Sequence, residues 1–145
     1  MQNRDYDSDS HLTYIPVSKK NHLCNVFDIM MDKYGDAGAV RYGIAGAFNV
    51  ALLKIISKKN YEKEYIRDFL SQNDIKSILF SSSQASTRPS LNETTFKGVL
   101  IPLPDRASLE EYEDKTSLLL RIEFETKKKV AKLKEIKQQL LQKYF

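Results

Sequence analysis

The two histidines and the one cysteine of this 145-residue chain stand in no catalytic pattern. His11 and His22 lie in a weakly patterned N-terminal stretch, with no serine or cysteine nucleophile at a recognisable turn. Cys24 is the only cysteine, and its position before an apolar run is typical of a small buried hydrophobe. The sequence contains no glycine-rich phosphate loop, no metal-ligand cluster and no adenine-methyltransferase signature. We therefore predict a non-enzyme with no catalytic residue, no metal and no cofactor.

Reading DNA is a different chemistry, which needs cations for phosphates and forked or amide side chains for base edges. The polar segment 81–92 supplies Gln84, Arg88 and Asn92. Arg88 can hold guanine through two hydrogen bonds, and Gln84 or Asn92 can hold adenine in the same way. The hydroxyl groups available there for phosphate oxygens include those of Ser86 and Thr87. A solvated connection between a helix and a strand would be equally polar, so this alternative stays open.

Two further sets of side chains are candidates for DNA contacts. The turn at 33–36 presents Lys33 and Tyr34, and Arg41 follows on the next predicted strand. The alternative for this turn is an ordinary hairpin. Lys58 and Lys59 are either phosphate contacts or solubilising charges, and the sequence does not decide between these roles.

The overall composition is compatible with a nucleic-acid partner without requiring one. The net charge is +4, with 41% hydrophobic and 29% charged residues, which is ordinary for a soluble domain. The chain has no run of 18 apolar residues and no signal-peptide pattern at its N-terminus. A single cysteine cannot form an internal disulfide. We expect a cytoplasmic protein that does not enter a membrane.

The elements that must position these side chains follow from hydrophobic periodicity and from turn residues. Four glycines between residues 35 and 46 indicate tight turns. One helix is expected to begin at Asn60 as its N-cap and to stop near residues 81–83. This pattern predicts an α/β (α+β) domain over residues 1–104, with a small mixed sheet and a packed helix. The expected strands are 26–31, 39–44, 50–56 and 98–101, the last closed by Pro102 and Pro104, with a short strand possible at 13–17.

The clearest element is a long helix over residues 107–145, a segment that contains no glycine and no proline. Ser108 and Glu111 form a capping-box pattern at its start. About 37 residues at 1.5 Å each give a rod of about 55 Å, longer than a small domain is wide. Positions spaced alternately by four and three residues form a coiled-coil seam with Ile122, Leu133, Ile136 and Leu140, which is imperfect because Thr126, Lys129 and Lys143 occupy its other positions. The residues expected at a helix–helix interface, in a homodimer or with another subunit, are Leu119, Ile122, Leu133, Ile136 and Leu140.

Several short segments follow one another in a characteristic order, namely 36–40 (DAGAV), 46–53 (GAFNVALL), 65–70 (YIRDFL), 86–92 (STRPSLN), 99–104 (VLIPLP) and 132–145 (KLKEIKQQLLQKYF). This order resembles the DNA specificity subunits of Type I restriction–modification systems. In those subunits an Asn-bearing strand, a helix, a Gly-Ser-Thr-like loop and an Ile-Pro-Leu-Pro strand precede a long conserved helix. Here Ala85 stands near the usual glycine of the loop, and Tyr112 replaces the usual glutamine that follows Glu110 and Glu111.

The resemblance implies the second part of a target-recognition domain, followed by a spacer helix. Such a subunit reads double-stranded DNA and directs a modification (methyltransferase) subunit, and through it a restriction subunit, to two half-sites separated by a fixed gap. Two copies pairing through the long helix would rebuild a full subunit, and the partner would bind the methyl donor. The alternative is a truncated cassette, a protein-interaction module that holds modification subunits through its helix and reads no sequence.

Overall fold

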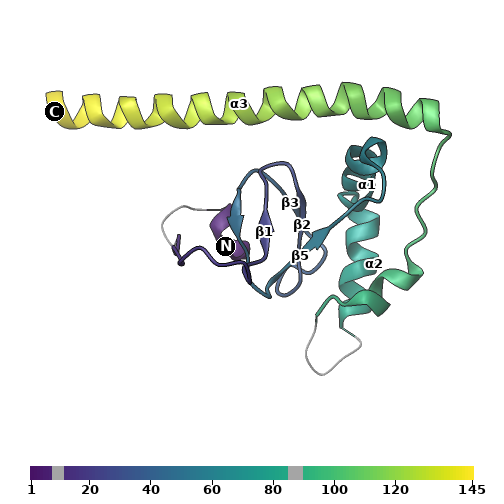
Figure 1. The fold of residues 1–145 in the computed structure, drawn as a ribbon. Coiled ribbons are helices and arrows are strands. Elements are labelled where there is room, and N and C mark those ends of the chain that lie inside the picture. Colours follow the sequence, from purple (N-terminus) through teal and green to yellow (C-terminus); the bar gives the residue numbers. More distant parts are fainter. Residues whose placement is uncertain (8–11, 85–89) are drawn as a thin grey trace.

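The computed structural model describes residues 1–7, 12–84 and 90–145. Its centre is a three-stranded antiparallel sheet in the order β3-β2-β5, formed by Val40–Arg41, Ile29–Asp32 and Leu52–Ile55. A two-stranded antiparallel pair, β1 (Leu23–Cys24) with β4 (Gly46–Ala47), lies beside it (Figure 1). The α/β class is confirmed. The expected mixed sheet is wrong, because every strand pair within the described residues is antiparallel.

The strand β2 is the buried centre of the domain. All four of its residues are buried, and it pairs with β5 along its whole length, from Ile29 opposite Ile55 to Asp32 opposite Leu52. The predicted strands at 26–31, 39–44 and 50–56 are present in shortened form as β2, β3 and β5. The segment 13–17 forms no strand. Its side chains are exposed, so no burial compensates the entropy of ordering them into a sheet.

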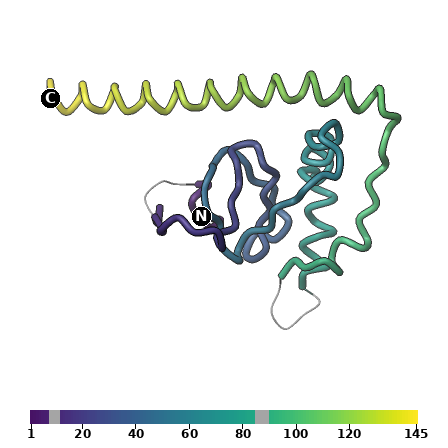
Figure 2. Tube along the Cα trace, viewed as in Figure 1, coloured from purple at the N-terminus to yellow at the C-terminus, as the bar shows by residue number. Residues whose placement is uncertain are grey.

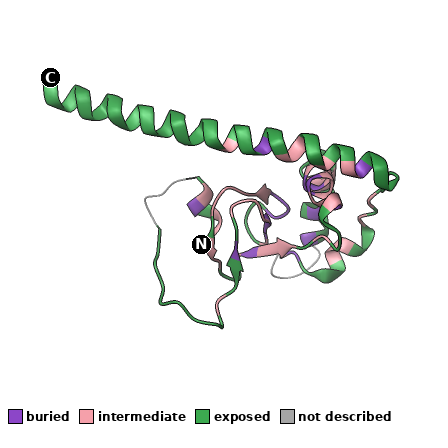
Figure 3. Ribbon diagram, turned by 45° about the horizontal axis from the view of Figure 1, so that its top comes forward, coloured by how far each residue is buried: buried purple, intermediate pink, exposed green. Residues whose placement is uncertain are grey.

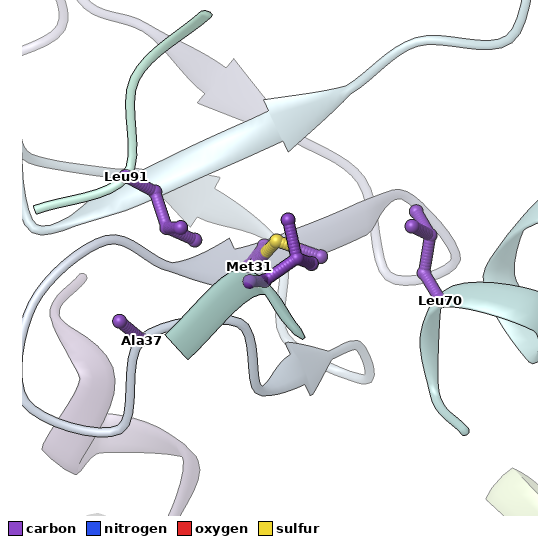
Figure 4. Packing of buried hydrophobic residues seen from close by; sticks show 5 residues of the cluster. Met31, Ala37, Leu70 and Leu91 are labelled. Atoms are coloured by element: carbon purple, nitrogen blue, oxygen red, sulfur yellow. The ribbon is translucent and has the colours of Figure 1, made fainter. Parts of the chain in front are cut away.

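The main core lies between this sheet and the helices. Met31 of β2 packs with Ala37, Leu70, Leu79 and Leu91, which come from four other segments of the chain (Figure 4). Leu79 and Leu91 are fully buried. Leu91 is therefore held against the sheet.

Glycines make the turns around β2 possible, as predicted. Gly35 has φ 73° and Gly38 has φ 94°, backbone angles that side-chain-bearing residues rarely adopt. Gly38 also lies directly against α2, since a Cβ built on it would come within 3.2 Å of the Leu79 Cβ. Both reasons exclude a larger residue at position 38.

The single helix expected from Asn60 to residues 81–83 is wrong. The structure has a 3₁₀ turn, η3 (Asn60–Glu62), then α1 (Lys63–Leu70) and α2 (Asn73–Ser83). Gln72 is extended, with ψ 139°, and it breaks the helix. The break turns α2 so that Leu79, like Leu70 of α1, reaches the same core. Tertiary packing thus overrides a helical pattern that continues through the break.

The strand expected at 98–101 is also wrong. Residues Glu93–Gly98 form a 3₁₀ helix, η4, capped by Asn92, whose side chain accepts hydrogen bonds from the backbone N–H groups of Thr94 and Thr95. Leu100 is 85% exposed. The cap favours helical turns before the proline-containing connection, so no strand partner is reached.

The long helix α3 spans Arg106–Tyr144, 39 residues in all. Its N-cap is Asp105, whose carboxylate accepts the N–H of Ser108 at 3.0 Å, so the expected capping box starting at Ser108 is wrong. The first half packs on α1 and η3 and buries Leu109 and Leu120. Every residue of 125–145 is exposed, and this half extends past the rest of the chain (Figures 2 and 3).

Candidate DNA-recognition surface and spacer helix

The turn at 33–36 and the end of the loop that follows α2 lie side by side. The backbone N–H of Leu91 donates to the carbonyl oxygen of Lys33 at 3.1 Å. On its other side the turn is held to α2 by the ion pair between Asp36 and Lys76, at 2.8 Å. Residues of two segments that are far apart in sequence, both predicted to contact DNA, therefore lie next to each other. We give the name recognition surface to Lys33 and Tyr34 of this turn together with Gln84, the C-cap of the helix α2 to which the turn is tied.

The backbone at Lys33 and Tyr34 is held by a hydrogen bond from the N-terminal segment. The side-chain amide of Asn3 donates to the carbonyl oxygen of Tyr34 at 2.9 Å. The Lys33 ammonium lies 5.5 Å from the centre of the Tyr34 ring. Within residues 1–7, 12–84 and 90–145, no carboxylate forms an ion pair with Lys33. Its charge is available for a phosphate group.

Gln84 and Asn92, the two residues predicted to read adenine, differ in the hydrogen bonds that their side chains already make. Gln84 is the exposed C-cap of α2, and its side-chain Nε2 donates to the Ser83 hydroxyl at 3.3 Å, the one side-chain hydrogen bond that it makes with the described residues. The side-chain Oδ1 of Asn92 already accepts hydrogen bonds from the backbone N–H groups of Thr94 and Thr95 in the η4 cap. Reading adenine requires both ends of the amide, so Gln84 is better placed for this role than Asn92. The predictions for Ser86, Thr87 and Arg88 fall outside the described residues.

Arg41 is held in a buried ion pair. Its Nε and Nη2 atoms donate to Asp32 Oδ2 at 3.2 and 3.0 Å, and Asp7 lies 3.5 Å from Nη1. Burial raises the pKa of the Asp32 carboxyl, although the hydrogen bond from Arg41 and its charge act in the opposite direction. Leaving a buried carboxylate without its cation would be costly. Arg41 is therefore engaged in structure and does not join the recognition surface.

Lys58 and Lys59 precede the 3₁₀ turn η3, which packs against α3, so they lie beside the start of the long helix. Lys59 pairs with Glu62 at 3.4 Å and lies 5.5 Å from the centre of the Tyr61 ring. Arg106 covers the same ring at 5.3 Å. No pattern in the sequence predicted this cluster of cations and an aromatic ring, because the packing of α3 on η3 brings its members together.

The predicted interface residues of α3 form an exposed seam. Their exposed fractions run from 41% at Ile136 to 65% at Leu133. At about 100° per residue, Ile122 lies about 200° and Leu133 about 220° around the axis from the buried Leu120. The seam thus faces away from the domain. At the free end it widens into an apolar groove of about 350 Å³, in which the sequence prediction missed Leu141, Tyr144 and Phe145.

The family model for the Type I restriction modification DNA specificity domain matches residues 10–138. The chain belongs to this family. No curated protein and no solved structure matches it. The match confirms the resemblance noted in the sequence and gives this specificity domain a DNA-recognition role in a Type I restriction–modification system, as a non-catalytic component.

The chemistry of the described side chains is consistent with that role. Cys24 of the specificity domain is buried, and burial raises the pKa of its thiol. His22 is exposed and lies 5.9 Å from the ring of Phe48. In the part of the chain that the structure describes, no group of three or more His, Cys, Asp and Glu side chains is arranged to hold a metal ion. None of the described helices is long and apolar enough to cross a membrane.

Proposed function

We propose that this specificity domain reads double-stranded DNA through the recognition surface and directs a modification subunit, and through it a restriction subunit, to a bipartite site. The observation that supports this most strongly is the contact between Leu91 and Lys33, which brings a residue of the polar segment 81–92 next to the turn at 33–36. Lys33 supplies a phosphate contact, and Gln84 supplies an amide that reads a base edge. The methyl donor belongs to the modification subunit.

We further propose that two copies pair through the seam of α3, each carrying its recognition surface to one half-site. The seam faces away from the domain, so a second helix can cover it without displacing any contact within the chain. The apolar groove at the free end supports this, because exposed apolar surface along one side of a helix favours burial against a partner.

The charges along α3 favour an antiparallel pair. Residues 106–126 carry six acidic and three basic side chains, whereas residues 127–144 carry seven lysines and one glutamate. An antiparallel arrangement puts the acidic half of one helix beside the basic half of the other. A parallel arrangement would place seven lysines beside seven lysines, which is repulsive. The two recognition domains would then lie toward opposite ends of the rod, as a bipartite site requires.

The test is selection from a randomised duplex pool by the purified domain together with a modification subunit, at two salt concentrations. The expected product is a motif of two half-sites with a fixed gap. Lys33→Ala should weaken binding on every sequence and reduce the salt slope by about 1, whereas Gln84→Ala should relax one base position at a cost of about 1–3 kcal/mol. Lys115→Ala, which removes an exposed lysine of α3 that is not a candidate for DNA contact, is the matched control and should leave the slope unchanged.

Sequence-blind binding that fades steeply with salt would refute the reading of DNA. The chain would then act as an interaction module that holds modification subunits through α3. The same selection distinguishes the two functions, because the modification subunit would still be retained while no motif emerged.

A further inference from the structure

The helix α1 contains a buried arginine that neither the recognition surface nor the seam uses. Arg67 is 6% exposed. Its guanidinium contacts the carboxylate of Glu64, which is also buried, and donates to Asp68 Oδ1 from Nε at 3.0 Å and from Nη2 at 2.8 Å. A buried charge persists only when it is paired and hydrogen-bonded. The question is what this costly arrangement holds in place.

Both carboxylate-bearing residues beside Arg67 are tied directly to the first turns of α3. The Tyr112 hydroxyl donates to Asp68 Oδ2 at 2.7 Å. The backbone N–H of Glu64 donates to Glu113 Oε2 at 2.7 Å. The Tyr112 ring also packs edge-on against Tyr65, with centroids 5.6 Å apart. These contacts form one tie between α1 and α3.

Arg67 also reaches a second tie, farther along α3. Its guanidinium lies 5.4 Å from the centre of the Tyr42 ring. The Tyr42 hydroxyl donates to Glu123 Oε2 at 3.2 Å, and Lys127 lies 6.0 Å from the centre of the same ring. Tyr112 and Glu123 are 11 residues apart, which is about 16 Å along a helix. A rod held at two such points cannot pivot on the domain, and Arg67 contacts residues of both ties.

We propose that Arg67 is a positioning residue that fixes the direction of α3 relative to the recognition domain, and thereby the gap between the half-sites. This inference rests on the proposed function. Adding one base pair moves the second half-site by about 3.4 Å and rotates it by about 35°. Only a domain held rigidly on its rod discriminates against so small an offset. A loosely hinged domain would follow the DNA and accept several gaps.

The first experiment measures the rod without DNA. Spin labels on cysteines introduced at Val50 and Gln142, both exposed positions, report the distance between domain and helix end in full-length protein diluted into unlabelled chain. Arg67→Met should broaden the distance distribution. Tyr112→Phe and Tyr42→Phe each loosen one tie and should broaden it less, and they keep the test valid if Arg67→Met does not fold. Lys115→Gln, which breaks an exposed pair with Glu111, should leave it unchanged.

The second experiment compares binding to duplexes that carry the selected half-sites at the selected gap and at gaps one base pair longer or shorter. The variants that broaden the distance distribution should lose most of the discrimination between gaps while keeping the base preference within each half-site. An unchanged distance distribution in all three variants would overturn the inference. So would a broadened distribution with full gap discrimination. If the unaltered protein selected no motif, the proposed function would fail, and the distances would still decide whether Arg67 fixes the rod.

Discussion

Replacing Leu133 by alanine tests the pairing of α3 at the most exposed residue of the seam. Leu133 is 65% exposed and lies in the apolar groove, beyond the part of the helix that packs on the domain. Alanine retains helix propensity. The substitution should therefore leave the thermal unfolding of the single chain almost unchanged while weakening the dimer.

The magnitude follows from the apolar area that pairing would cover. Fully burying a leucine side chain stabilises by about 1.5–3 kcal/mol. Since about two-thirds of Leu133 remains exposed, pairing can gain on the order of 1–2 kcal/mol from each copy. A symmetric dimer contains the substitution twice, so the expected loss is about 2–4 kcal/mol, or a dimer Kd weakened by about 30- to 700-fold.

Sedimentation velocity over a concentration series measures this directly. The unaltered chain should shift from monomer to dimer as concentration rises, and Leu133→Ala should remain monomeric over the same range. Gln139→Ala is the matched control, because residue 139 lies on α3 outside the groove and its exposed side chain donates a 3.4 Å hydrogen bond to Glu135 of the same helix. Antiparallel pairing of opposite charges also predicts that added salt weakens the dimer. The same dimer Kd for the unaltered chain, Leu133→Ala and Gln139→Ala would refute the proposal that the seam is a dimer interface. So would an unaltered chain that stays monomeric at every concentration.

Three further predictions concern the domain itself. Leu79→Ala should lower the free energy of unfolding by about 2–5 kcal/mol, because Leu79 is fully buried; a urea midpoint equal to that of the unaltered protein would contradict this packing. Arg41→Met should cost about 3–5 kcal/mol at neutral pH by leaving the Asp32 carboxylate buried and unpaired. Burial raises the pKa of Asp32, so the folded state binds its proton more tightly than the unfolded chain. Stability therefore falls as pH rises from the carboxyl's ordinary range through this raised pKa, and the variant should regain stability on acidification, whereas a pH-independent deficit would refute the pairing. Because burial raises the pKa of the Cys24 thiol, iodoacetamide should alkylate it slowly in the folded protein and rapidly in denaturant, and equal rates would place the thiol at the surface.

The local sequence pattern was sufficient to predict the elements whose conformation depends mainly on neighbouring residues. The absence of glycine and proline over 107–145, with apolar residues at steps of three and four, predicted α3 and the seam. The glycines at 35–46 predicted the turns around β2, because a positive φ is a property of the residue itself. The order of short motifs was enough to suggest the family.

The same local rules failed where packing competed with them. Helical periodicity continues through Gln72, but the chain breaks there because Leu70 and Leu79 both reach the core around Met31. The apolar residues at 98–101 have strand propensity, yet the Asn92 cap winds the preceding residues into η4. Asp105 is the N-cap in place of Ser108, because its carboxylate accepts a hydrogen bond from the backbone N–H of Ser108, a contact that the composition does not reveal.

The sequence by itself determined which side chains are candidates for contacting DNA, and it determined the long uninterrupted helix and its apolar seam. Tertiary structure alone decided which of those side chains act together. It joined Lys33 to the loop ending at Leu91, committed Arg41 to Asp32, and tied Arg67 to both ends of the contact with α3. The physical reason is that the cost of burying a charge depends on which opposite charge lies within a few ångströms, and that proximity is set by the path of the whole chain.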